Sequence, residues 1–252
     1  MTLRAQFTVA RGDFTLALDL ELEGVTAVMG PRGAGKTTLL YALLGAVRPR
    51  EGKIVLGART LFDERGVDLP PEERHVAYVP RGLGLRPDER ALEAVAFARR
   101  RGSARERRSA ALDHLGAVEL VGASDLRASK LAPEDRLGVA FARAMASEPR
   151  LLLFDDPLGG LDPAARADAR RRLADWLHGA RLPALVVTDE PADALEIAPS
   201  LLVLEAGRAV AHGPLEEVAV QPSTEFLAAL MPALIEPPSF SVPPSTFVSE
   251  DE

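Results

Sequence analysis

One octapeptide constrains the fold of this chain more than any other feature. Residues 30–37 read Gly-Pro-Arg-Gly-Ala-Gly-Lys-Thr, which fits the pattern GxxxxGK[ST]. An apolar run suited to a strand, Val25–Met29, precedes it, and leucines at helical spacing follow it within Lys36–Ala46. Glycines let successive backbone N–H groups turn toward phosphate oxygens, and the helix start adds the positive end of its dipole. The pattern therefore predicts a phosphate-binding loop between a strand and a helix rather than a chance glycine-rich turn.

The last side chains of this loop have distinct predicted roles. Lys36 can reach the β- and γ-phosphates of a nucleoside triphosphate, and the Thr37 hydroxyl can ligate Mg²⁺. The dinucleotide pattern GxGxxG does not fit, because Thr38 stands where its last glycine would be. The predicted nucleotide-binding residues of the loop are Gly30, Pro31, Arg32, Gly33, Ala34, Gly35, Lys36, Thr37 and Thr38. We therefore expect a nucleoside triphosphate and Mg²⁺ as ligands.

A second segment of the sequence fits the same chemistry. The apolar run Leu151–Asp155 predicts a strand that ends in a carboxylate, which can hold the metal through water. Buried strands also end in Asp for turn formation alone, but a phosphate loop earlier in the chain favours the metal role. We therefore expect Thr37 and Asp155 to be the metal-binding residues.

Composition and charge exclude several other classes of protein. The chain has 252 residues, 47% of them hydrophobic, and a net charge of −7, so it can bury a full core. It has no cysteine, which excludes disulfides, thiol nucleophiles and cysteine-ligated metals, and its four histidines include no HxxxH pair. No apolar run approaches the roughly 20 residues that cross a bilayer, and no export signal is recognisable. We therefore expect a cytoplasmic protein.

Arginines gather in residues 99–108, which raises the question of nucleic-acid binding. Glutamate and alanine interrupt this run, no aromatic residue lies within it, and the whole chain is acidic. These features favour a solvated helix face over a nucleic-acid interface. We expect no nucleic-acid partner.

The order of the predicted elements indicates an α/β fold. Strands and helices alternate over most of the chain, which implies right-handed crossovers and a mostly parallel, buried sheet. The predicted strands are Leu3–Val9, Phe14–Leu20, Val25–Met29, Ile54–Leu56, Thr60–Phe62, His75–Val79, Leu151–Asp155, Ala184–Thr188 and Leu201–Leu204. The first two of these strands are predicted to form one hairpin, and the fourth and fifth another. The predicted helices are Lys36–Ala46, Glu89–Arg101, Ala104–Leu115, Pro133–Ala146, Pro163–His178 and Pro191–Ile197. Residues 1–231 are predicted to be one domain, and the proline-rich, acidic residues 232–252 a disordered tail.

The stretch Lys130–Asp162 resembles the ATPases of ABC transporters. Residues 131–135 read Leu-Ala-Pro-Glu-Asp, residues 139–145 read Val-Ala-Phe-Ala-Arg-Ala-Met, and Leu-Asp ends the loop after the Asp155 strand. In that family a signature loop opens a helix with an ALARAL-like run, followed by the metal-binding strand and a loop ending in LD. The similarity covers about residues 3–220, and the early segments are most similar to the ATPase subunit of molybdate-type importers.

The resemblance implies a particular architecture and a particular set of partners. It implies a P-loop NTPase fold with a RecA-like core and a mostly parallel sheet, an antiparallel β-subdomain and an inserted helical subdomain at about residues 87–147. It also implies a homodimer, or a heterodimer with another ATP-binding subunit, in which each nucleotide lies between one subunit's phosphate loop and the other's signature loop. Membrane permease subunits would hold such a dimer at the inner face of the cell membrane.

Four sites depart from the family pattern. Residues 132–134, Ala-Pro-Glu, replace the Ser-Gly-Gly of the LSGGQ signature with an apolar group, a nitrogen without N–H and an anion. Arg81 stands where a glutamine positions the attacking water, and Asp189 where a histidine contacts the γ-phosphate. Asp156 stands where a glutamate acts as base, and its side chain is shorter by about 1.5 Å. Since a misplacement of that size can cost about 10²-fold in rate, we expect slow hydrolysis.

Three aromatic or acidic residues have structural and functional interpretations. Phe14 can stack on adenine, as an aromatic residue does in this family, or pack in the core. Asp162 matches an acidic residue of the inter-subunit loop, but Leu-Asp-Pro is also an ordinary helix N-cap followed by proline. Trp176, on an amphipathic helix, is predicted to be a core residue.

Two functions remain open on the sequence alone. The first is a subunit that binds Mg-ATP and couples it to a permease that imports molybdate or a similar oxyanion, with slow hydrolysis. The second is a catalytically degenerate nucleotide-binding scaffold or regulatory protein that does not turn over ATP. A small-molecule kinase is disfavoured, because the signature-like helix and the Leu-Asp loop do not fit one. A measurement of ATP turnover separates the first two.

Overall fold

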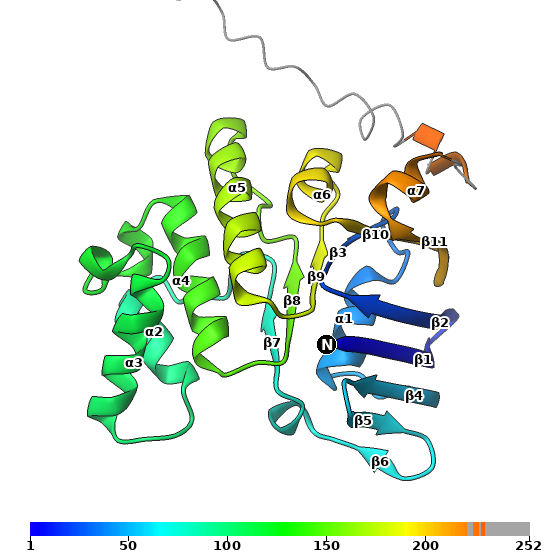
Figure 1. The fold of residues 1–252 in the computed structure, drawn as a ribbon, viewed down its shortest axis with the longest axis horizontal. Coiled ribbons are helices and arrows are strands. Elements are labelled where there is room, and N and C mark those ends of the chain that lie inside the picture. The colour runs from blue at the N-terminus through cyan, green and yellow to red at the C-terminus, as the bar shows by residue number, and fades with distance from the viewer. Residues whose placement is uncertain (221–223, 227, 230–252) are drawn as a thin grey trace, which may run out of the picture.

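The computed structural model describes residues 1–220, 224–226 and 228–229, so the predicted tail at 232–252 lies outside the described residues. A six-stranded sheet runs through the molecule in the order β11-β10-β3-β9-β8-β7 (Figure 1). All neighbours in it are parallel except β10 and β11. Its strands are β3 (Val25–Met29), β7 (Val76–Val79), β8 (Leu151–Asp155), β9 (Ala184–Val187), β10 (Ser200–Glu205) and β11 (Arg208–Pro214). The predicted α/β class with a mostly parallel sheet is confirmed.

Both faces of the central strands β3, β8 and β9 are buried, which explains why these strands are mainly apolar. Phe154 and Val186 lie on the face that packs against helices α4 to α6, whereas Leu153 and Leu185 lie on the face that packs against α1. These helices are α1 (Lys36–Leu44), α4 (Pro133–Ala146), α5 (Pro163–Ala180) and α6 (Pro191–Ile197). The alternation of neighbouring residues between two apolar clusters fixes the register of the strands, since a shift by one residue would exchange the two faces.

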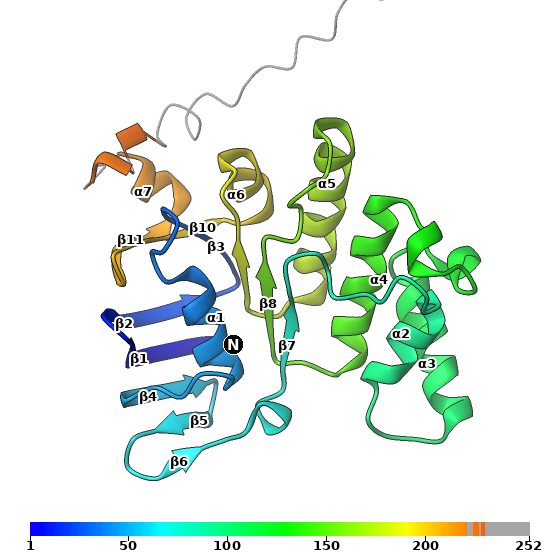
Figure 2. The same ribbon diagram turned by 180° about the vertical axis from the view of Figure 1, so that it is seen from behind.

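A second, antiparallel sheet covers α1 on its other side, as the two views in Figures 1 and 2 show. Its order is β2-β1-β4-β5-β6, and both predicted hairpins are present in it. Its strands are β1 (Thr2–Arg11), β2 (Phe14–Glu23), β4 (Glu51–Leu56), β5 (Arg59–Asp63) and β6 (Val67–Asp68). In β1 and β2 every second residue is buried, so this sheet has one face on the core and one in solvent.

Helices α2 (Ala91–Ala98), α3 (Ala104–Gly116) and α4 pack together at the end of the molecule away from the antiparallel sheet (Figure 1). They lie in the chain between the neighbouring parallel strands β7 and β8. Arg143 of α4 donates hydrogen bonds to the carbonyl oxygens of Leu83 (2.5 Å) and Gly84 (2.6 Å). The loop that follows β7 is thereby fastened to this group of helices.

Several predicted boundaries differ from the structure. The helix predicted to reach residue 46 ends at Leu44, because Gly45 adopts a left-handed conformation (φ 89°) and its N–H bonds back to the last carbonyl groups. The helix predicted over 89–101 is confined to α2, since Arg99 is extended. The strands β6 and β11 and the helix α7 (Leu215–Val220) have no counterpart among the predicted elements.

Candidate nucleotide-binding site

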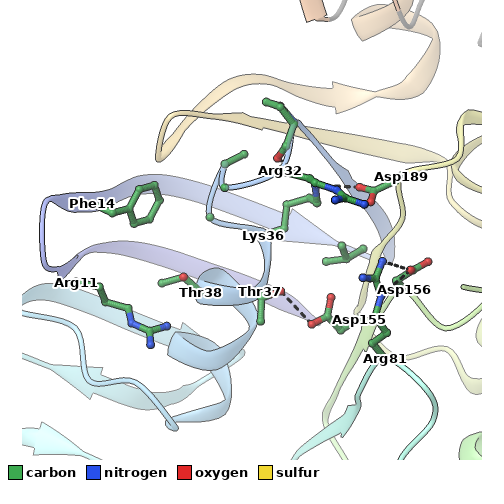
Figure 3. A pocket seen from close by; sticks show the side chains of 15 residues that line it. Arg11, Phe14, Arg32, Lys36, Thr37, Thr38, Arg81, Asp155, Asp156 and Asp189 are labelled. Atoms are coloured by element: carbon green, nitrogen blue, oxygen red, sulfur yellow. Dashed lines mark hydrogen bonds and ion pairs between the residues drawn. The ribbon is translucent and has the colours of Figure 1, made fainter.

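A cavity of about 730 Å³ opens at the carboxyl ends of β3, β8 and β9, where parallel strands bring their following loops together (Figure 3). Its walls contain most of the predicted site residues. The lining residues are Arg11, Phe14, Pro31, Arg32, Gly33, Ala34, Gly35, Lys36, Thr37, Thr38, Arg81, Asp155, Asp156, Val187 and Asp189. Residues 132–134 lie elsewhere, at the start of α4.

The loop between β3 and α1 wraps this cavity because glycines stand at its two critical points. Gly30 has φ 146°, and a Cβ atom there would lie 2.0 Å from the carbonyl oxygen of Leu204 on β10. Gly35, just before α1, has φ 109°, and its Cβ would lie 3.0 Å from the ring of Phe14. The Phe14 ring thus lies against the loop, lines the cavity and packs on the apolar cluster around α1. Its stacking on adenine stays a prediction.

Two oxygens suited to Mg²⁺ converge on one wall of the cavity. The Thr37 hydroxyl donates a hydrogen bond to Asp155 Oδ2 at 3.0 Å, and the Tyr78 hydroxyl donates to the same oxygen at 3.3 Å. Burial raises the pKa of Tyr78, and the Asp155 charge adds to this effect, so the phenol keeps its proton and orients the carboxylate. Mg²⁺ takes one or two protein oxygens and completes its shell with water and phosphate. Thr37 and Asp155 therefore fit a nucleotide-bound Mg²⁺.

A metal at this point would depend on the nucleotide. Within residues 1–220 and the two short described segments after them, no group of three or more His, Asp or Glu side chains could hold a metal ion by themselves. Nucleotide phosphates would have to supply the remaining ligands, as they commonly do for Mg²⁺.

The ammonium group of Lys36 is held by acceptors on two segments. Its Nζ donates to the carbonyl oxygen of Gly30 and lies 3.3 Å from that of Pro31, within the loop itself. It also forms an ion pair with Asp189, with 3.0 Å between Nζ and Oδ1 (Figure 3). The Lys36 side chain is only 12% exposed, so this contact is shielded on the lysine side.

Arg81 and Asp156, two of the residues that depart from the family pattern, form a second ion pair. Arg81 donates two hydrogen bonds to Asp156 Oδ2, one from Nε at 2.9 Å and one from Nη2. These bonds raise the pKa of Arg81. The Asp156 carboxylate also lies against Gly159, where a Cβ would come within 2.4 Å of Oδ2. The carboxylate that the resemblance predicts at the position of the base is therefore engaged by a cation and enclosed by its own loop.

Residues 132–134, at the start of α4, offer few groups that could bind an anion. Ala132 precedes the helix without a side-chain cap, and Pro133 occupies its first position. Glu134 and Asp135 lie in the first turn, where their charges stabilise the positive end of the helix dipole. Asp135 also forms an ion pair with Arg172 of α5, with 3.5 Å between Oδ1 and Nη1. The helix start is thus neutralised from within the chain.

Sequence patterns do not reveal several residues that shape the site. Arg11 lines the cavity from the end of β1, and no motif contains it. The buried Asp193 accepts hydrogen bonds from the Thr188 hydroxyl at 2.9 Å and from Arg166 at 2.7 Å, which fixes the backbone beside Asp189. Arg166 and Asp193 lie on the different helices α5 and α6, so only the weak signal of a charged residue on an amphipathic helix could have indicated them, and Arg11 on β1 had no such signal.

Asp162 and Trp176 both make the structural contacts that the sequence predicts for them. Asp162 Oδ1 accepts from the backbone N–H groups of Ala164 and Ala165, both at 3.1 Å, so it caps α5. Its role at an interface stays a prediction. Trp176 packs against Phe141 with ring centroids 5.4 Å apart and borders the main core cluster.

The fold and the cavity together define a phosphate-loop nucleotide-binding cassette. Residues 14–159 match the sequence profile of the family described as "ABC transporter". The molybdenum import ATP-binding protein ModC of Paramagnetospirillum magneticum is 36% identical over 84% of this chain and 59% of that protein. The Fe(3+) ions import ATP-binding protein FbpC of Yersinia pestis is 33% identical over 82% of this chain and 59% of that protein. The chain therefore belongs to the ABC transporter family, among its ATP-binding proteins.

Solved structures give the same fold. A nucleotide-free ATP-binding cassette from an ABC transporter superposes with a TM-score of 0.76 at 19% identity, covering 91% of this chain and 98% of the other. A cassette in its ADP conformation gives 0.75 at 17% identity, with 90% and 98% covered. The predicted P-loop NTPase fold is confirmed. The chain spans somewhat more than half the length of the curated relatives named above.

Proposed function

We propose that this chain is an ATP-binding subunit of an importer for molybdate or a related oxyanion. The single observation that carries the proposal is the convergence of Lys36, Thr37 and Asp155 on one cavity, from a phosphate loop and a neighbouring strand end. The similarity to ModC proteins over more than four-fifths of the chain supports the importer class and favours molybdate as cargo. Residues 1–231 would form one ATP-binding domain, with a helical subdomain at about 87–147.

In the proposed complex, residues 30–38 cradle the phosphates of ATP with their N–H groups. The Thr37 hydroxyl would ligate Mg²⁺, and Asp155 would hold it through water. The metal supplies charge neutralisation of the phosphates when bound. Phe14, which faces the loop, stacks on the adenine.

We propose slow hydrolysis because the base position is disabled. Asp156 must leave Arg81 before its carboxylate can orient a water molecule, and its side chain is shorter than that of glutamate. A partner subunit would meet the nucleotide with residues 132–134, in which Ala132 has no side-chain hydroxyl and Pro133 has no backbone N–H. Asp189 and Arg81 take the places of groups that would contact the γ-phosphate and water.

The proposed partners are membrane permease subunits and a second ATP-binding subunit, identical or different. A second cavity, of about 400 Å³, lies between the loop after β7 and the start of α4, and Leu83, Leu85 and Pro87 line it on the loop side. We propose that a permease segment docks there, which would place the chain at the inner face of the membrane. Among the residues that the structure describes, no helix is long and apolar enough to span a bilayer.

A catalytically degenerate scaffold is the second candidate, and the Arg81–Asp156 ion pair is the observation that favours it. Both candidates predict nucleotide binding, and they differ in turnover.

The decisive experiment measures ATP binding and turnover on the same sample of the full chain. Lys36→Ala is expected to lower ATP affinity at least tenfold, because the ammonium contacts the phosphates. Lys53→Ala is the matched control, since Lys53 pairs with Asp63 on the antiparallel sheet at 3.2 Å. Equal ATP affinity in the two variants would refute the nucleotide site. Binding with no turnover, even with the permease present, would refute the transport motor and favour the scaffold.

A further inference from the structure

The three N–H donors of the Lys36 ammonium are fully used within this chain. A lysine ammonium has three donors and no acceptor. Here the acceptors are the carbonyl oxygens of Gly30 and Pro31 and the carboxylate of Asp189. A phosphate group that binds Lys36 must therefore displace one of them. Displacing a carbonyl oxygen costs a neutral hydrogen bond, whereas a phosphate close to Asp189 also meets a like charge.

Asp189 is held close to the cavity by a rigid neighbour. The Thr188 hydroxyl donates to the buried Asp193 at 2.9 Å and accepts from the Glu190 N–H at 3.1 Å, so the backbone on both sides of Asp189 is anchored. Asp193 is in turn paired with Arg166 and Arg170. The Asp189 side chain itself is 53% exposed and points at Lys36 (Figure 3). It can turn aside only by giving up the ion pair.

We propose that Asp189 takes the place of a terminal phosphate beside Lys36, so that the site binds a nucleoside diphosphate in preference to a triphosphate. The inference rests on the proposed nucleotide site and adds a ligand preference to it. The loop N–H groups can receive two phosphates while the Lys36–Asp189 pair persists. A third phosphate at Lys36 would have to displace the carboxylate or lie next to it.

The size of the preference follows from the charges. Two like unit charges about 5 Å apart at an effective dielectric constant near 20 shift an equilibrium by roughly two orders of magnitude. Solvent screens the half-exposed Asp189, which reduces the expected effect to about tenfold. Removing the charge should therefore raise the affinity for the triphosphate relative to the diphosphate by about that factor.

Isothermal titration calorimetry of the full chain with Mg-ADP and with a non-hydrolysable Mg-ATP analogue tests this preference. Asp189→Asn keeps the shape of the side chain and removes its charge, and Asp189→His is a second variant. Asp168→Asn is the matched control, because Asp168 is 52% exposed, pairs with Arg171 and lies on α5 outside the cavity lining. ADP binding by each variant shows that its pocket is folded.

The expected result is tighter binding of ADP by the parent chain, and an ATP-to-ADP affinity ratio about tenfold higher in both Asp189 variants only. An unchanged ratio in variants that still bind ADP would overturn the inference and leave the proposed function intact. The same would follow if Asp168→Asn changed the ratio equally. Failure of the parent chain to bind either nucleotide would refute the proposed function and the inference with it.

Discussion

Replacing Arg81 by glutamine should accelerate ATP hydrolysis, because it releases the carboxylate that the arginine holds. Arg81 donates two hydrogen bonds to Asp156 Oδ2, and the Asp156 side chain is 12% exposed while that of Arg81 is 66% exposed. A carboxylate engaged in this way is a poor base for a water molecule, because its lone pairs are occupied and its charge is compensated. Glutamine is shorter and neutral, so it leaves Asp156 free.

The expected gain follows from the free energy of that contact. An exposed ion pair contributes at most about 1 kcal/mol, whereas hydrogen bonds to buried charged groups contribute about 1.5–3 kcal/mol. The half-shielded pair of Arg81 and Asp156 lies between these limits, at about 1.4 kcal/mol, which corresponds to about tenfold in rate. The shorter reach of Asp156 remains, so the variant should still be slower than a site with a well-placed base.

Single-turnover formation of phosphate from Mg-ATP, followed by acid quench, measures this gain, since it separates the chemical step from product release. Arg4→Gln is the control, because Arg4 is 65% exposed and also pairs with a carboxylate, Glu21, at 3.0 Å, but on the antiparallel sheet. The control should leave the rate unchanged. A slower reaction in Arg81→Gln would refute the reasoning, because it would show that Arg81 stabilises the transition state rather than blocking the base.

Two further predictions concern stability. The fully buried Arg74 guanidinium donates hydrogen bonds to the carbonyl oxygens of Leu69, Ala42 and Leu43. Arg74→Ala should therefore lower the free energy of unfolding by about 3–5 kcal/mol and the melting temperature by about 10 °C. Arg48→Ala, which removes an exposed partner of the same Asp68, should change the melting temperature little, and equal losses would contradict the account. Burial lowers the pKa of His114, with Arg99 adding to the effect, so the unfolded chain binds the proton more tightly and stability should fall as the pH drops below about 6.5. Denaturant titrations at pH 7.5 and 5.5 should show a smaller loss of stability in His114→Asn, and an identical loss would contradict a neutral, half-buried His114.

The parts of the fold that the sequence predicts well are those with a strong local period or a spaced motif. Strands β3 and β8 and helices α4 and α6 match their predicted bounds, because each has proline, glycine or a charged residue at its ends and an apolar run or stripe inside. The edge strand β6 has only two residues, and β11 has no buried residue, so neither contains a long apolar run. Their pairing with β5 and β10 depends on tertiary contacts that no local period records.

The candidate site also has features that the sequence predicts and features that depend on tertiary contacts. Spacing alone places Lys36, Thr37 and Asp155 at one edge of a parallel sheet, because strand ends in such a sheet share an edge. It does not show that Arg81 meets Asp156, or that Asp189 meets Lys36. Each pair joins two segments far apart in the chain, and a contact of this kind depends on side-chain placement within about 1 Å.

The two ion pairs also explain how the departures from the family pattern can coexist. Relative to that pattern, Arg81 adds a positive charge and Asp189 adds a negative one, so the net charge of the cavity wall is the same while its distribution changes. Each new charge also has a partner: Arg81 pairs with Asp156, and Asp189 with Lys36. Replacing only one of Arg81 and Asp189 by a neutral residue should therefore change the net charge of the cavity wall. Arg81→Gln leaves the wall with one positive charge fewer, so its faster chemistry should come with weaker ATP binding, and adding Asp189→Asn should restore the affinity and keep the faster step.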